Sequence, residues 1–386
     1  MRQVTDFEDI RPFNDNEFHE KMVCLLKEPY FRGIINAVMP NVDYDEFCDK
    51  LLRIDSLHEF QRDIILPWLL NLIKTTSDGF EYQGIEQIEQ NKNYLYMSNH
   101  RDIVLDSSFL CTALLKEGYP SCEIAIGSNL LIYNWISDFV RINKCFIVKR
   151  GIGIKQALEA AHQLSAYIHY AITEKKSSIW IAQREGRSKD SNDRTQEALI
   201  KMLGLEGNGN WIENLRELNL TPVSISYEYD PCDSLKAYEF LQKSKDPDFK
   251  KSQKDDLKNM ETGITGYKGL MNFCITPCIN PSLDSLNPQL EKGELLQSVI
   301  NIIDRQIHLN YRIYPGNYIA YDTYYETDRF AGKYTTEQKE KFERYIDNQI
   351  TKLGELSDED KAFVHNKMML MYSNTLRNQL EAQQKD

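Results

Sequence analysis

Apolar residues follow two different spacings along the chain, and the changes between them divide it into three parts. Residues 13–75 carry apolar positions at helical spacing, for example Met22, Leu25 and Leu26. From about residue 80, strand-like runs alternate with helix-patterned stretches, and beyond residue 290 the pattern is helical again. The strand-like runs span 93–98, 122–127, 144–149, 178–183, 220–227 and 268–277.

Strands that alternate with helices are typical of an α/β layer with a largely parallel sheet. The stretch from Ile154 to Ile172 shows such a helix, because its apolar residues fall along one stripe. We therefore predict an α/β fold with a largely parallel mixed sheet flanked by helices. An N-terminal helical cap (1–80) precedes the core (81–285), and a helical C-terminal tail (286–386) follows it.

Turn signals and polar segments refine this plan. Pro40-Asn41 and Ser77-Asp78-Gly79 predict turns that break the cap into a small helical unit. Residues 245–265 are polar and predict an exposed loop or a solvated helix. The tail should contain helices near 291–309, 336–354 and 358–383.

Composition limits the function classes. A net charge of −12 over 386 residues argues against broad nucleic-acid binding and against simple electrostatic adhesion to anionic lipid, so membrane contact should be local. Eight scattered cysteines without a Cys-x-x-Cys pair indicate reduced thiols in a cytoplasmic compartment. The first residues, 1–6, do not lead into the apolar core of a signal peptide. No apolar run approaches the roughly 20 residues that a membrane-spanning helix needs. We expect a soluble or peripheral protein.

The first candidate site lies where the run 93–98 ends. His100 follows this run, and Asp102 and Asp106 come shortly after it. A carboxylate that orients an imidazole and stabilises its cation suits general-base catalysis, although a histidine bonded to an acid at a strand end can be purely structural. Asp106 is favoured as the partner. Asp102 is the alternative, because side chains two apart on an extended strand share a face.

Two further segments carry basic residues. Five Lys and Arg side chains and no acid lie between Arg141 and Lys155. Most such runs are solvated surface, but Lys149 or Arg150 could meet a phosphate at the strand end, and arginine's planar fork fits phosphate oxygens better. Residues 184–188 (Arg-Glu-Gly-Arg-Ser) follow the run 178–183 and would alone be read as a charged turn.

In order, the segments 99–106, 144–150, 183–189 and 221–228 resemble the four blocks of the glycerol-phosphate acyltransferase family. The resemblance covers about residues 90–280. Two departures mark a divergent subfamily: five residues rather than four separate His100 from Asp106, and a residue is missing between Gly186 and Arg187. The stretch Gly127-Ser128-Asn129-Leu130 favours the glycerol-3-phosphate branch over the lysophosphatidate branch.

The resemblance implies an acyltransferase of phospholipid biosynthesis. A fatty acyl chain would pass from acyl-CoA or an acyl carrier protein directly to a hydroxyl of glycerol-3-phosphate, with neither metal nor organic cofactor. His100 would act as the general base and Asp106 would orient it. The implied substrate contacts are Arg101, Lys149, Arg150, Glu185, Gly186, Arg187 and Ser188, with Arg184 as a rival to Arg187.

A lipid product suggests peripheral docking on the inner face of the cell membrane, with apolar residues near Trp68, Tyr133 or Trp135 as candidates. The nearest alternatives keep the chemistry but acylate lysophosphatidate or a lipid precursor without phosphate, such as an acylated amino acid. A metal-dependent phosphohydrolase using His100 and Asp102 is a different class, as is a non-catalytic lipid-binding relative. No Gly-x-Ser-x-Gly elbow indicates a serine hydrolase.

Overall fold

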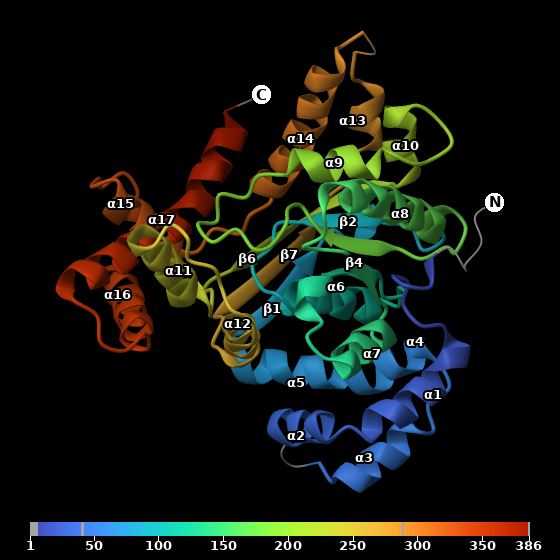
Figure 1. Cartoon of the computed structure of the whole chain (residues 1–386). Coiled ribbons are helices and arrows are strands. Elements are labelled where there is room, and N and C mark those ends of the chain that lie inside the picture. The colour runs from blue at the N-terminus through green and yellow to red at the C-terminus, as the bar shows by residue number, and fades with distance from the viewer. Residues whose placement is uncertain (1–6, 40–41, 288, 385–386) are drawn as a thin grey trace.

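The computed structural model describes residues 7–39, 42–287 and 289–384. Residues 1–6 and the turn expected at Pro40-Asn41 lie outside these ranges. A seven-stranded sheet crosses the middle of the molecule, with helices on both of its faces (Figure 1). The N-terminal helices lie together at one end of the molecule, and α16 and the start of α17 lie at another side (Figure 1).

The sheet has the strand order β1-β7-β6-β2-β5-β3-β4. Strands β2 to β6 run parallel to one another, whereas β7 pairs antiparallel with β6 and β1 pairs parallel with β7. This confirms the predicted α/β class with a largely parallel mixed sheet. The strands are β1 (Gly79–Gln83), β2 (Leu95–Ser98), β3 (Glu123–Gly127), β4 (Cys145–Val148), β5 (Ile179–Ala182), β6 (Leu220–Tyr227) and β7 (Leu270–Ile275).

The central strands are buried on both faces, as parallel strands covered by helices must be. On one face Leu95, Met97 and Ile181 pack with residues of α8 (Ile154–Thr173) and α14 (Lys292–Leu309). On the other face Tyr96 and Trp180 pack with residues of α5 (Leu66–Thr76) and α6 (Leu105–Lys116). These two apolar layers fix the sheet and therefore the positions at which its strands end.

The N-terminal helices share a third apolar cluster. It joins Phe18, Met22 and Phe47 to Ile142 of α7 (Asn134–Ile142), so these helices are tied to the α/β layer. The helices are α1 (Asp15–Leu26), α2 (Pro29–Val38), α3 (Tyr44–Leu51) and α4 (Leu57–Phe60), and a π-helical turn (Gln61–Ile65) leads into α5.

The helices expected near 291–309, 336–354 and 358–383 are present as α14, α16 (Thr336–Thr351) and α17 (Asp358–Gln383). Helix α17 packs against α15 (Pro315–Tyr324) and α11 (Asp233–Lys245) around Met368 and Tyr372. The polar segment 245–265 contains α12 (Gln253–Thr265). The remaining helices are α9 (Glu197–Leu203), α10 (Trp211–Glu217) and α13 (Asn280–Asp284), with 3-10 turns at Ile85–Gln87, Ser128–Leu130 and Ala331–Lys333.

Within the described ranges, no helix combines the length and apolar character that crossing a bilayer requires.

Candidate active site

The predicted blocks meet at one edge of the sheet. Because β2, β4, β5 and β6 are parallel, their carboxyl ends lie at the same edge, where open α/β sheets place their ligand sites. His100 follows β2, Arg150 follows β4, Glu185 follows β5 and Asp230 follows β6. The topology therefore gathers segments that are up to 130 residues apart in sequence.

Asn99 fixes the direction in which the chain leaves β2. Its buried side-chain amide donates to the carbonyl of Ile225 at 2.9 Å, and its Oδ1 accepts from the Ile225 N–H at 2.8 Å. This paired contact ties the residue after β2 to the middle of β6. The ring of His100 then lies edge-on to Trp180, with centroids 5.7 Å apart.

His100 contacts Asp106 in the first turn of α6, with Nδ1 2.8 Å from Oδ2. The same oxygen accepts from the backbone N–H groups of Arg101 (2.6 Å) and Asp102 (3.0 Å), and Oδ1 accepts from the hydroxyl of Tyr227 (3.2 Å). A carboxylate at Nδ1 favours the tautomer with its proton on Nδ1, which leaves Nε2 as the basic atom. The His100 side chain is 12% exposed, so a substrate hydroxyl can reach this ring.

Asp102 has a different set of partners. Its Oδ1 accepts from the backbone N–H groups of Val104 and Leu105, both at 2.8 Å, which turns the chain into α6. Burial, together with the charge of Asp106, raises the pKa of Asp102. Of the two acids weighed as the partner of His100, the structure places Asp106 against the imidazole.

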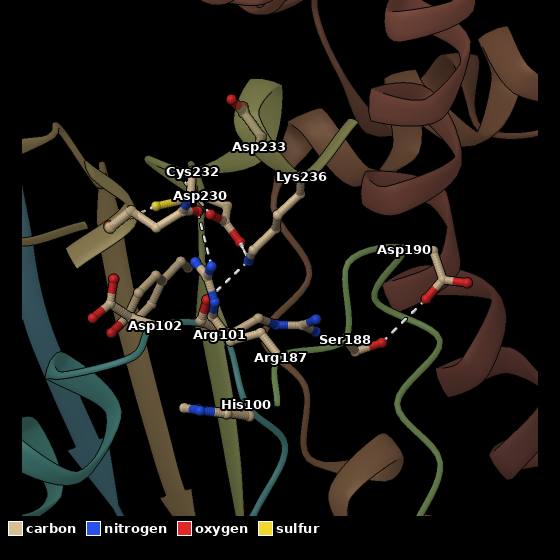
Figure 2. Close-up of polar contacts among 12 residues, drawn as sticks. His100, Arg101, Asp102, Arg187, Ser188, Asp190, Asp230, Cys232, Asp233 and Lys236 are labelled. Atoms are coloured by element: carbon tan, nitrogen blue, oxygen red, sulfur yellow. Dashed lines mark hydrogen bonds and ion pairs between the residues drawn. The ribbon is translucent and has the colours of Figure 1, made fainter. Parts of the chain in front are cut away.

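Arg187 lies nearby and is 9% exposed. Its Nη2 donates to Oδ1 of Asn259 at 2.8 Å, whereas Nη1 is buried and has no hydrogen-bond partner in the described part of the chain. Figure 2 shows Arg187 and His100 among the polar side chains of this edge. An unpaired buried guanidinium nitrogen is costly unless an anion completes it. Its rival Arg184 is only half-buried.

The other predicted contact positions are spread around this centre. Arg150 forms an ion pair with Glu185 (2.9 Å), and its backbone N–H donates to Ser128. Lys149 is turned toward Asp9 of the N-terminal segment, with its Nζ 2.5 Å from the carboxylate.

The remaining positions lie on or beneath the loop after β5. Gly186 is exposed with φ +66°, a conformation that favours glycine. Ser188 is buried and donates to Asp190. Arg101 lies beneath the loop in a buried ion pair with Asp193 at 2.7 Å.

Residues 79–217 match a family model described as Acyltransferase. The segment from β1 to α10 is an acyltransferase domain. The match contains His100, Asp106, Arg150 and Arg187, and it confirms the predicted enzyme class, an acyltransferase.

A comparison with curated proteins finds no match. Among solved structures, the crystal structure of the 1-acyl-sn-glycerophosphate (LPA) acyltransferase PlsC from Thermotoga maritima is similar at 12% identity. The likeness covers 74% of this chain and 94% of that chain, with a TM-score of 0.36.

The sheet edge formed by the carboxyl ends of the parallel strands also contains residues that the sequence patterns did not single out. Lys236 of α11 is 1% exposed, donates to the Arg101 carbonyl at 2.8 Å and forms an ion pair with Asp230. Asp230 and Asp233 come shortly after β6. Acidic residues just beyond the end of a parallel strand could therefore have indicated from the sequence that they lie at this edge. Asn259 lies in a polar segment that gives little sequence signal. Gly263, a glycine inside the same helix, is the feature that indicates close packing of this helix against another segment.

In the described ranges, no group of three or more His, Cys, Asp or Glu side chains is arranged to hold a metal ion.

The buried carboxyl group of Asp233 should make the folding stability of the protein depend on pH. Burial, with the charge of Asp230, raises its pKa to about 7, whereas an unfolded aspartate titrates near pH 4 (about 3.9). The folded chain therefore keeps a proton that the unfolded chain releases, and this contribution is lost as the pH rises toward 7 and above. Relative to Asp233→Asn, the wild type should lose about 2–3 kcal/mol of unfolding free energy between pH 5 and 8. Urea unfolding at both pH values measures this difference. The exposed Asp248→Asn is the control, and parallel profiles for wild type and Asp233→Asn would contradict the assignment.

Proposed function

We propose that this acyltransferase moves a fatty acyl chain from a thioester, acyl-CoA or acyl carrier protein, to a hydroxyl of glycerol-3-phosphate in phospholipid synthesis. The observation that carries the proposal is the placement of two groups at one edge of the sheet. His100 is oriented by Asp106 at Nδ1, and Arg187 has a buried nitrogen that lacks a counter-ion. One group suits a hydroxyl and the other suits a phosphate.

The chemistry follows from the oriented imidazole. Nε2 of His100 takes the proton of the acceptor hydroxyl as its oxygen attacks the thioester carbonyl, and Asp106 stabilises the resulting imidazolium. The tetrahedral intermediate then collapses, the carbon–sulfur bond breaks, and the thiolate leaves with the proton from His100. An ester and a free thiol are the products, and no acyl-enzyme forms.

The acceptor phosphate is assigned to Arg187. A phosphate oxygen at Nη1 would satisfy the buried guanidinium and place the acceptor beside His100. Arg150 is a second candidate contact, because its ion pair with Glu185 is partly exposed and such pairs contribute little. Lysophosphatidate carries the same phosphate and is the alternative acceptor. An acceptor without phosphate would leave Nη1 unpaired, which favours the phosphate-bearing class.

We also propose peripheral docking on a membrane through apolar residues next to Arg150. Ile152, Ile154 and Leu158 are 37%, 94% and 61% exposed. Ile152 lies just before α8, and the other two lie in its first turns, shortly after the basic strand end. Of the earlier candidates, Tyr133 is 54% exposed, whereas Trp68 and Trp135 pack against interior clusters. Exposed apolar side chains at a site entrance give local membrane contact in a chain of net charge −12.

The catalytic pair is tested by thiol release from palmitoyl-CoA with glycerol-3-phosphate as acceptor. His100→Ala and Asp106→Asn should each lower kcat by about 10²–10⁴-fold, the range that a general base contributes. Asp102→Asn is the matched control, because Asp102 is buried beside Asp106 but its carboxylate accepts from backbone amides of the α6 turn rather than from His100. A folded Asp102→Asn protein that loses as much activity as Asp106→Asn would refute the assignment of Asp106.

The acceptor site is tested by replacing the two rival arginines. Arg187→Ala should raise the KM for glycerol-3-phosphate by roughly 10- to 100-fold, since a charge-assisted contact contributes about 1.5–3 kcal/mol. Arg184→Ala should change it less than about threefold. Steady-state kinetics with varied acceptor separates these outcomes. An unchanged KM in Arg187→Ala would refute a phosphate site at this residue.

Membrane docking is tested by sedimentation with phospholipid vesicles. Ile154→Asp combined with Leu158→Asp should lower the bound fraction at least tenfold, because each buried apolar side chain contributes about 1.5–3 kcal/mol. Leu205→Asp, in the loop between α9 and α10, is the control for an added charge at an exposed leucine. Equal binding of the double variant and the control would rule out this surface.

A further inference from the structure

Helix α12 (Gln253–Thr265) lies outside the matched segment 79–217, yet it contacts the proposed acceptor site. Its Asn259 is 6% exposed, and its Oδ1 accepts from Nη2 of Arg187 at 2.8 Å. The Nδ2 of Asn259 donates to the Asp255 carbonyl at 2.7 Å, and its own carbonyl accepts from the Cys232 thiol at 3.3 Å. These contacts orient the amide so that its oxygen faces the guanidinium.

One turn further along α12, Gly263 lies against the loop that contains His100. A Cβ at this position would lie 1.9 Å from Oδ2 of Asp102, so only glycine allows the helix to approach this closely. A glycine inside a helix costs about 1 kcal/mol relative to alanine. The close approach brings Asn259 within reach of Arg187. Helix α12 therefore bridges the loop after β2 and the loop after β5.

The partner of Arg187 differs in charge from the partners of four other basic residues around it. These four form ion pairs with carboxylates: Arg101 with Asp193, Arg150 with Glu185, Lys189 with Glu239 and Lys236 with Asp230. Arg187 instead donates to the neutral amide of Asn259 and forms no ion pair within the described residues, although the buried Asp102 carboxylate lies near enough to interact with its charge. A buried guanidinium with an unpaired Nη1 is suited to an anionic ligand.

We infer that Asn259 is a specificity-determining residue, which holds one nitrogen of Arg187 and leaves the other for the phosphate of the acceptor. This inference rests on the proposed function. The amide supplies the hydrogen bond that fixes the guanidinium plane without the negative charge that would compete with phosphate. A carboxylate at the same position would bind Arg187 and repel the acceptor.

The test exchanges the amide for the isosteric acid. Asn259→Asp should raise the KM for glycerol-3-phosphate at least tenfold with kcat changed less than threefold, because the new carboxylate neutralises Arg187 but does not touch His100. Turnover of glycerol, which has no phosphate, should stay within twofold. Gln253→Glu is the matched control, since it places the same isosteric charge at an exposed position of the same helix, and its KM should stay within twofold.

Further variants separate a failure of this inference from a failure of the proposed function. If Arg187→Ala raises the KM for glycerol-3-phosphate but Asn259→Asp does not, Asn259 has no role in specificity. If Arg187→Ala leaves the KM unchanged, the acceptor site itself is misplaced, and the inference falls with it. Should Asn259→Asp fail to fold in thermal unfolding, Asn259→Ser replaces it. Its expected rise in KM is two- to fivefold with unchanged kcat, and an equal fall of kcat would overturn the inference.

Discussion

The carboxylate of Asp106 is the group on which the rest of the site depends. It is fully buried, and a buried charge is stable only when hydrogen-bond donors surround it. Two backbone amides of the loop after β2, the Tyr227 hydroxyl and the His100 imidazole provide these donors. The same contacts fix the path of the loop, the start of α6 and the tautomer of the imidazole. The extra residue between His100 and Asp106 lengthens this loop while the contact between the two side chains is kept.

The loop is held from its outer side by the C-terminal half of the chain. The Arg101 peptide donates its N–H to Asp106 and accepts from Lys236 at its carbonyl, and its side chain pairs with Asp193. Helix α17 reaches the loop after β5, where Asn374 donates to the Asp190 carbonyl at 2.7 Å. Each ion pair here is buried, so removing one partner costs about 3–5 kcal/mol. The segment beyond the family match is therefore part of the scaffold that holds the acyltransferase site.

Sequence patterns predicted the strands from β2 to β7 and a largely parallel sheet, because these follow from local spacing. Asp106 could be favoured over Asp102 on the same basis, and the structure places it against the imidazole. Spacing does not determine which distant side chain meets a given charge. Arg101 and Lys149 belong to basic or catalytic blocks, yet they pair with Asp193 and Asp9, which lie in other segments. Strand β1 was missed because it is short and follows a turn signal, and Asn259 was missed because a polar helix shows no apolar stripe.

The charges at this edge bear on how a protein of net charge −12 could present the proposed site for an anion. Most of its basic side chains here are paired with acids, which keeps the loops in place but leaves little free positive charge. In the proposed function, phosphate recognition would fall to Arg187, whose hydrogen-bond partner is the neutral amide of Asn259. Because Arg187 is buried, its charge is poorly screened by solvent, and a single free nitrogen can discriminate strongly between an acceptor with phosphate and one without it. Selectivity in this acyltransferase would thus arise from one arginine that hydrogen-bonds to a neutral amide rather than from a surplus of basic residues.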